Sequence, residues 1–119
     1  MGEYQGYQLA APISFWDASE EMIKEFTGGC GPGGLGDYFV PDMILFLSMK
    51  PACVIHDWTY SVWDDKPGFY LSNTVFKNNM VRINNQHQGY QWLKRRRLKY
   101  IQIYYEAVNN FGESSYYAS

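Results

Sequence analysis

The sequence carries little charge and only two cysteines, and it has no long hydrophobic run. Charged residues make up 18% of its 119 residues and hydrophobic residues 46%, which excludes intrinsic disorder and fits one domain around one core. Its most apolar stretch, Tyr38 to Met49, contains Pro41 and Asp42 and is too short to span a membrane as a helix. Met1 to Ala11 lacks the basic start and apolar run of a secretory signal. The chain therefore stays inside the cell, has lost a leader, or is exported by another route.

Acidic and basic residues are unevenly distributed along the chain, although the net charge is only −2. Residues 1–65 carry ten acids and two bases, a sum of −8, and residues 66–119 carry eight bases and two acids, a sum of +6. Such polarity suits an anionic partner, but it can also be satisfied by pairing the two halves with each other. The 11 Tyr, 7 Phe and 4 Trp are expected mainly in the core.

Hydrophobic periodicity predicts a mainly α fold in a single domain over residues 1–119. Ser72 is expected to cap the third helix and Gly112 to end the last, while Asp17 or Ser19 would cap the first. The turn Asp64–Gly68 is expected to separate the second and third helices, and strands are considered only at Asp37–Val40 and Gly68–Leu71. The expected helices have the approximate bounds Phe15–Thr27, Pro51–Trp63, Asn73–Ile83 and Tyr90–Phe111. The last is the clearest, with a repeating stripe at Tyr90, Leu93, Arg97, Ile101, Tyr104, Val108 and Phe111.

A glycine-rich loop over Gly28–Gly36 contains the run Gly29-Cys30-Gly31-Pro32-Gly33-Gly34. Four glycines in six residues let the backbone turn several carbonyls toward one point, which suits calcium, or several amides, which suits a phosphate. The run lacks the Lys-Ser/Thr ending of a phosphate-binding P-loop. A plain flexible loop is the alternative interpretation.

A second run, Cys53-Val54-Ile55-His56-Asp57-Trp58-Thr59-Tyr60, falls on the second predicted helix. His56 and Asp57 point about 100° apart there, so they would serve two sites on adjoining faces. The other histidine, His87, is interpreted as structural. Cys30 and Cys53 are either buried thiols or a disulfide, and a disulfide would clamp the glycine loop against the Asp57 face.

These two runs together resemble the phospholipase A2 superfamily. Secreted members read C-G-x-G-G in the calcium loop and C-x-x-H-D-x-C-Y in the following helix. The Gly-Pro-Gly spelling is also similar to the phospholipase domain of parvovirus capsid proteins. The resemblance covers about residues 28–80.

The resemblance implies a small phospholipase A2-like helical domain that hydrolyses a carboxylic ester of a glycerophospholipid with calcium, at a membrane surface. His56 would act as general base, with Asn73 and Tyr60 orienting it, and Asp57 would bind Ca²⁺. The remaining implied ligands are the carbonyls of Gly29, Gly31 and Gly33. A disulfide between Cys30 and Cys53 is also implied, and it predicts an extracellular, periplasmic or virus-particle location.

Three features depart from the family pattern. The separation between Cys30 and His56 is longer, which suggests an insertion such as Tyr38–Asp42. Thr59 and Ser72 stand where the family has a pair of half-cystines, and Asn73 stands where it has the dyad aspartate. An amide can orient the imidazole but cannot neutralise imidazolium, so reduced activity is expected. The alternative function is a catalytically weak or inactive module that binds lipid or calcium.

Other chemistries rank lower. Cys30, His56 and Asn73 have the order of a papain-like peptidase, and Cys30, Cys53 and His56 would bind zinc without a fourth ligand. The basic run Lys94–Arg97 with Lys99 could bind phospholipid headgroups or nucleic acid, but four adjacent helical residues cannot share one face. Phospholipid is therefore the expected partner and nucleic acid is not, while protein partners are unknown.

Overall fold

The computed structural model describes residues 1–26, 43–63 and 65–118, with side chains up to residue 110. Within these ranges the chain is mainly α, as predicted. None of the helices described there is long and apolar enough to cross a membrane. The elements in chain order are β1 (Gly2–Tyr4), β2 (Tyr7–Leu9), α1 (Ile13–Asp17), α2 (Glu20–Phe26), β3 (Met43–Ile44), β4 (Leu47–Ser48), α3 (Lys50–Val62), α4 (Lys66–Gln86) and α5 (Gln91–Ala118).

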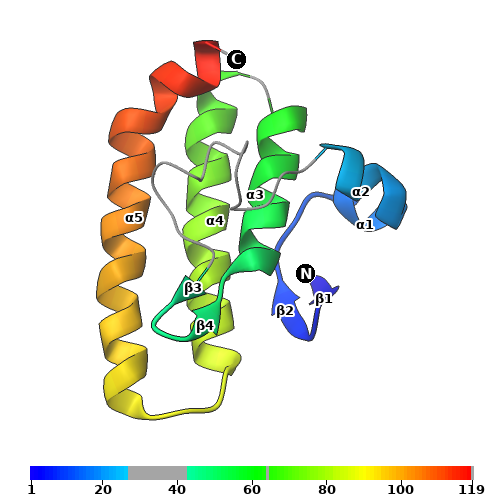
Figure 1. Ribbon diagram of the computed structural model, residues 1–119. Helices are drawn as coiled ribbons and strands as arrows, with labels where there is room; N and C mark the ends of the chain where they lie inside the picture. Colours follow the sequence, from blue (N-terminus) through cyan, green and yellow to red (C-terminus); the bar gives the residue numbers. More distant parts are fainter. Residues whose placement is uncertain (27–42, 64, 119) are drawn as a thin grey trace.

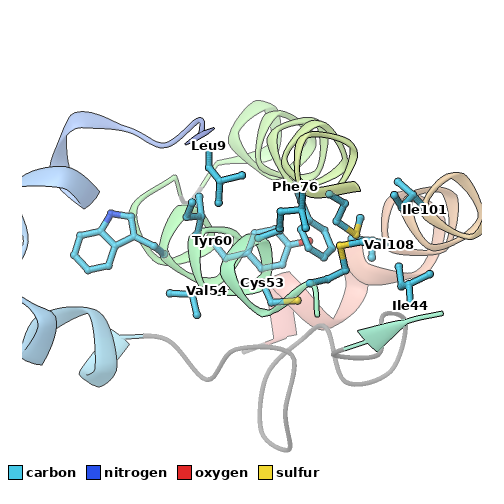
Figure 2. Packing of buried hydrophobic residues seen from close by; sticks show 14 of the residues in the cluster. Leu9, Ile44, Cys53, Val54, Tyr60, Phe76, Ile101 and Val108 are labelled. Carbon is cyan, nitrogen blue, oxygen red and sulfur yellow. The ribbon is translucent and has the colours of Figure 1, made fainter. Parts of the chain in front are cut away.

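Three long helices form the body of the molecule, and successive helices run in opposite directions (Figure 1). The middle helix, α4, packs against both α3 and α5. The hydrophobic core fills the space between them, with Leu9 of β2 and Ile44 of β3 closing it from the sides (Figure 2). Its central side chains include Cys53 and Tyr60 of α3, Phe76 of α4, and Ile101 and Val108 of α5.

The first half of α4 differs from the sequence prediction. The helix begins at Lys66, seven residues before the expected start at Asn73. The two helices are separated where the turn Asp64–Gly68 was predicted, but the last part of that turn is helical, and the predicted Gly68–Leu71 strand is wrong. Asp65 caps it by accepting a hydrogen bond from the Gly68 amide at 2.7 Å, and Pro67 fits the first turn, where no backbone N–H is needed. Ser72 is consequently inside the helix, fully buried, and is not a cap.

Of the other predicted helix ends, some are confirmed and some are wrong. The expected helix Phe15–Thr27 is divided into α1 and α2 because Ala18 is extended, and Ser19 accepts a hydrogen bond from the Met22 amide at the start of α2. The helix α3 matches its prediction to within a residue at each end. The last helix continues through Gly112 to Ala118, so the expected glycine cap is wrong.

Two side-chain amides of α4 attach the N-terminal hairpin to the helices. β1 and β2 pair antiparallel, and Asn79 binds both the amide and the carbonyl of Ala10, at 2.8 and 2.7 Å. Gln86 does the same for Gln8, at 2.8 and 3.0 Å. These amides take the place of a neighbouring strand, so a hairpin of three-residue strands is held by contacts about 70 residues away in sequence.

A second hairpin, β3–β4, lies against α5 and has an unusual turn. Its two loop residues, Leu45 and Phe46, have φ of +45° and +70°, a region in which side chains other than glycine are strained. Arg97 of α5, which is only 3% exposed, donates to the Ile44 carbonyl at 3.2 Å and to the Leu45 carbonyl at 2.7 and 3.1 Å. The candidate strand Asp37–Val40 and the proposed insertion Tyr38–Asp42 lie outside the described residues.

Candidate active site

His56 lies in the middle of α3 and faces α4, in the interior of the molecule. It is 2% exposed. Its ring stacks on Phe76 of α4 with centroids 4.1 Å apart and planes 9° apart, and Tyr60 lies one helical turn away with its ring centroid also at 4.1 Å. The two aromatic rings therefore fix the plane of the imidazole.

Asn73 of α4 connects the polar atoms of this cluster. Its Oδ1 lies 2.9 Å from His56 Nε2 and accepts a hydrogen bond from the Tyr60 hydroxyl at 2.5 Å. Since Oδ1 can only accept, His56 Nε2 carries the proton and Nδ1 keeps its lone pair. The three residues expected to form the catalytic group, His56, Asn73 and Tyr60, are thus brought together by two helices.

Burial controls the charge of His56. It lowers the pKa of the imidazole to about 4, and the hydrogen bond to Asn73 raises that pKa by a smaller amount. The ring is therefore neutral at pH 7, which is the form that can accept a proton from water. The same burial opposes formation of the imidazolium, and the amide of Asn73 supplies no charge to offset this cost.

A pair of hydroxyls lies beside the cluster at the positions of the absent half-cystines. Thr59 donates a hydrogen bond to the His56 carbonyl at 2.9 Å and also contacts the Ser72 hydroxyl. Both residues are fully buried. The hydrogen bond between Thr59 and Ser72 thus links α3 to α4 one residue before Asn73, at the positions where the resembled family has a pair of half-cystines.

The expected calcium site is only partly within the described residues. Asp57 follows His56 on α3 and is half-buried, on a different side of the helix from the Asn73 contact. Gly29, Gly31, Gly33 and Cys30 all lie outside the described ranges, and so does any pairing of Cys30 with the buried Cys53. Within those ranges no three His, Cys, Asp or Glu side chains gather as a metal site.

The remaining sequence candidates lie away from this cluster. His87 is at the C-terminal end of α4, with Nδ1 3.4 Å from the Tyr7 hydroxyl. In the basic run Arg95, Arg96 and Lys99 are exposed whereas Arg97 is buried, so these bases do not share one face, as the helical geometry predicts. A hollow of about 250 Å³ against α3 is lined by Met22, Trp58, Ser61 and Val62 and does not include His56.

One member of the site, Asn109, was not predicted from the sequence. This half-buried residue of α5 accepts a hydrogen bond from Asn73 Nδ2 at 2.8 Å. Asn109 directly follows Val108 of the apolar stripe. Its position at the edge of a buried helix face was the one sequence feature that could have indicated a buried polar contact. Comparisons with known proteins matched no family model, no curated protein and no solved structure.

Proposed function

We propose that this protein hydrolyses a carboxylic ester of a glycerophospholipid in the manner of a phospholipase A2. The observation that supports the proposal best is the buried group formed by His56, Asn73 and Tyr60. A neutral imidazole with one nitrogen hydrogen-bonded to an acceptor and the other free to accept is the arrangement needed to deprotonate a water. The hydroxyl pair Thr59 and Ser72 supports the alignment with the family independently, because it joins the two helices at the positions of the family's disulfide.

In this mechanism His56 Nδ1 takes the proton from the attacking water, while Nε2–H remains on Asn73 Oδ1. Tyr60 holds that oxygen from the other side, and Phe76 keeps the ring plane fixed. The proton on His56 would later pass to the leaving alcohol. The orientation of the imidazole that these steps need is already provided by α3 and α4.

Calcium would be held by the Asp57 carboxylate with the carbonyls of Gly29, Gly31 and Gly33, a set of hard oxygen ligands that suits this cation. The ion would polarise the ester carbonyl and stabilise negative charge on its oxygen. The position of Asp57 suits a calcium ligand, because the residue that follows His56 on α3 lies on the adjoining face of the same helix. The Cys30–Cys53 disulfide remains part of the proposal and would attach the glycine loop near Asp57.

A second function, lipid or calcium binding with little turnover, is favoured by the burial of His56. Its pKa of about 4 makes the imidazole a weak base, and Asn73 cannot neutralise the imidazolium. In that case calcium would recruit the protein to phospholipid without releasing fatty acid. The location in an extracellular, periplasmic or virus-particle setting applies to both functions and depends on the disulfide.

The test measures fatty acid release from vesicles of phosphatidylcholine and phosphatidylglycerol, with calcium or with excess chelator. The parent protein should be active only with calcium, and His56→Ala and Asp57→Asn should each reduce the rate by at least about 10³-fold. His87→Ala is the matched control and should retain full activity. Hydrolysis that persists in chelator, or in folded Asp57→Asn, contradicts the calcium mechanism. Calcium-dependent vesicle binding without release by the parent protein identifies the binding function.

A further inference from the structure

The amide group of Asn73 has two orientations that differ in what they present to His56. With Oδ1 toward the imidazole, as found here, Nε2 is the protonated nitrogen and Nδ1 is the base. With the amide turned over, Nδ2 would face the imidazole, Nε2 would have to be the unprotonated nitrogen, and Nδ1 would carry the proton. A turned amide therefore removes the lone pair that the proposed reaction uses.

The contacts on the His56 side do not choose between these orientations by themselves. The Tyr60 hydroxyl can donate or accept, and a neutral imidazole offers Nε2 as either donor or acceptor. An aspartate at position 73 would present oxygens in both orientations, so this ambiguity belongs to asparagine alone. The orientation of the Asn73 amide must therefore be set by the group that contacts the amide atom pointing away from His56.

Asn109 supplies that choice. Its Oδ1 lies 2.8 Å from Asn73 Nδ2, so it binds the amide nitrogen and leaves the amide oxygen for His56 and Tyr60. Turning the Asn73 amide over alone would place two carbonyl oxygens against each other, which loses a hydrogen bond in a buried cluster, so the Asn109 amide would have to turn at the same time. Asn109 comes from α5, whereas His56 and Asn73 come from α3 and α4, so all three long helices take part.

We infer that Asn109 is a positioning residue that fixes the Asn73 amide and, through it, the tautomer of His56. The catalytic consequence rests on the proposed function, but the tautomer does not, because it can be observed without lipid or calcium. In this way a site with asparagine in place of the dyad aspartate would keep the imidazole in the working form. Asn109 touches neither the water nor the substrate in this scheme.

The test is ¹⁵N NMR of the His56 ring in the full chain at pH 7, without calcium. In the parent protein Nε2 should show the shift of a protonated nitrogen and Nδ1 that of an unprotonated one. Asn109→Leu removes the acceptor and should shift both signals toward a mixture of tautomers. Asn109→Asp can only accept, so it should retain the parent pattern. Asn110→Leu, at the exposed neighbouring position, is the matched control and should also leave the pattern unchanged.

Activity gives a second readout if the proposed function holds. Asn109→Leu should lower kcat roughly tenfold with KM unchanged, since it changes the state of the base and not the binding of lipid, and Asn109→Asp should restore the rate. An unchanged tautomer in folded Asn109→Leu overturns the inference whatever the protein hydrolyses. If Asn109→Leu does not fold, Asn109→Asp decides alone, and a protonated Nδ1 in that variant overturns the inference.

Discussion

Two groups of buried polar side chains each include residues of both α4 and α5, and they differ in how completely their atoms are paired. Around Asn73, the amide oxygen meets His56 and Tyr60 and the nitrogen meets Asn109. Around Asn84 and Arg97, the contacts are mainly with backbone carbonyls, and among the described residues neither Asn84 Oδ1 nor Arg97 Nη1, both buried, has a hydrogen-bond partner. Each unpaired atom costs about 1–3 kcal/mol.

The difference indicates what each group does. Around Asn73 side chains from three helices determine one another's orientation, which is the property that a reacting imidazole needs. Arg97 instead uses its charge to bind the carbonyls of a strained turn, so its effect is on the conformation of β3–β4. We therefore expect changes at the first group to alter chemistry and changes at the second to alter stability.

Asn73→Asp should produce the largest effect, a rise in hydrolysis of about 10²-fold. A carboxylate would stabilise the imidazolium, and in serine proteases losing the triad aspartate costs about 10⁴-fold. We expect a smaller change because Tyr60 and Asn109 already orient residue 73. The measurement is initial rate on vesicles with calcium. Asn84→Asp is the control, since it buries a carboxylate on the same helix away from His56 and should not raise the rate. No gain in folded Asn73→Asp would favour the binding function.

Arg97→Met should lower the free energy of unfolding by about 3 kcal/mol, because the buried Ile44 and Leu45 carbonyls lose donors from a charged group. Urea unfolding measures this, and the specific activity of the folded variant should be unchanged. Arg96→Met removes an exposed charge from the neighbouring position and should stay within about 0.5 kcal/mol of the parent. A fall in activity without a loss of stability would contradict the assignment of the two groups.

Replacing both hydroxyls next to the site, Thr59→Cys with Ser72→Cys, should create a disulfide between α3 and α4. The two oxygens are already in contact, and closing the 13-residue separation from 59 to 72 should stabilise the fold by about 3 kcal/mol. Peptide mapping identifies the bond, and thermal unfolding with and without reductant measures its effect. The single variant Thr59→Cys should show no such gain. Failure to pair would mean that α3 and α4 are not aligned as in the resembled family.

The pH dependence of stability should report the burial of His56. The pKa of its imidazole is about 4 when folded and near 6.5 when unfolded, so the unfolded state binds a proton first as the pH falls. The free energy of unfolding should therefore be unaffected by His56 above about pH 6.5 and should decrease as the pH falls from about 6.5 to about 4. Below about pH 4 the total loss is about 3 kcal/mol. Urea unfolding in chelator at several pH values measures it. His56→Gln should remove this component, and His87→Gln should keep it.

The cluster of His56, Asn73 and Tyr60 was largely predictable because local signals define it. Pro51 marks the start of α3, and the spacing of His56 and Tyr60 on one helix follows from periodicity. Asn73 was placed through the resemblance. The start of its helix was predicted too late, because a proline and a glycine at 67 and 68 are typical of turns. In α4 both fit the first helical turn, and a Cβ at Gly68 would lie 2.8 Å from Trp63 Cβ.

Long-range contacts account for what could not be predicted. The strands of β1 and β2 are three residues each, and Asn79 and Gln86 hold their backbone from a distant helix. Asn109 is likewise defined by its contact with Asn73, 36 residues away. Arg97 was expected both in the apolar stripe and in a basic run, and the structure places it in the stripe because Ile44 and Leu45 provide carbonyls there.

Phe46→Gly should have the smallest effect, a gain of about 0.5–1 kcal/mol in the free energy of unfolding. Phe46 has φ of +70° and is 85% exposed, so glycine removes strain and little buried area. Phe46→Ala keeps the Cβ and should show no gain. If Arg97 imposes this conformation on the turn, the gain should shrink when Phe46→Gly is combined with Arg97→Met, which a double-mutant cycle measures. Equal gains in both backgrounds would mean that the turn adopts positive φ without the arginine.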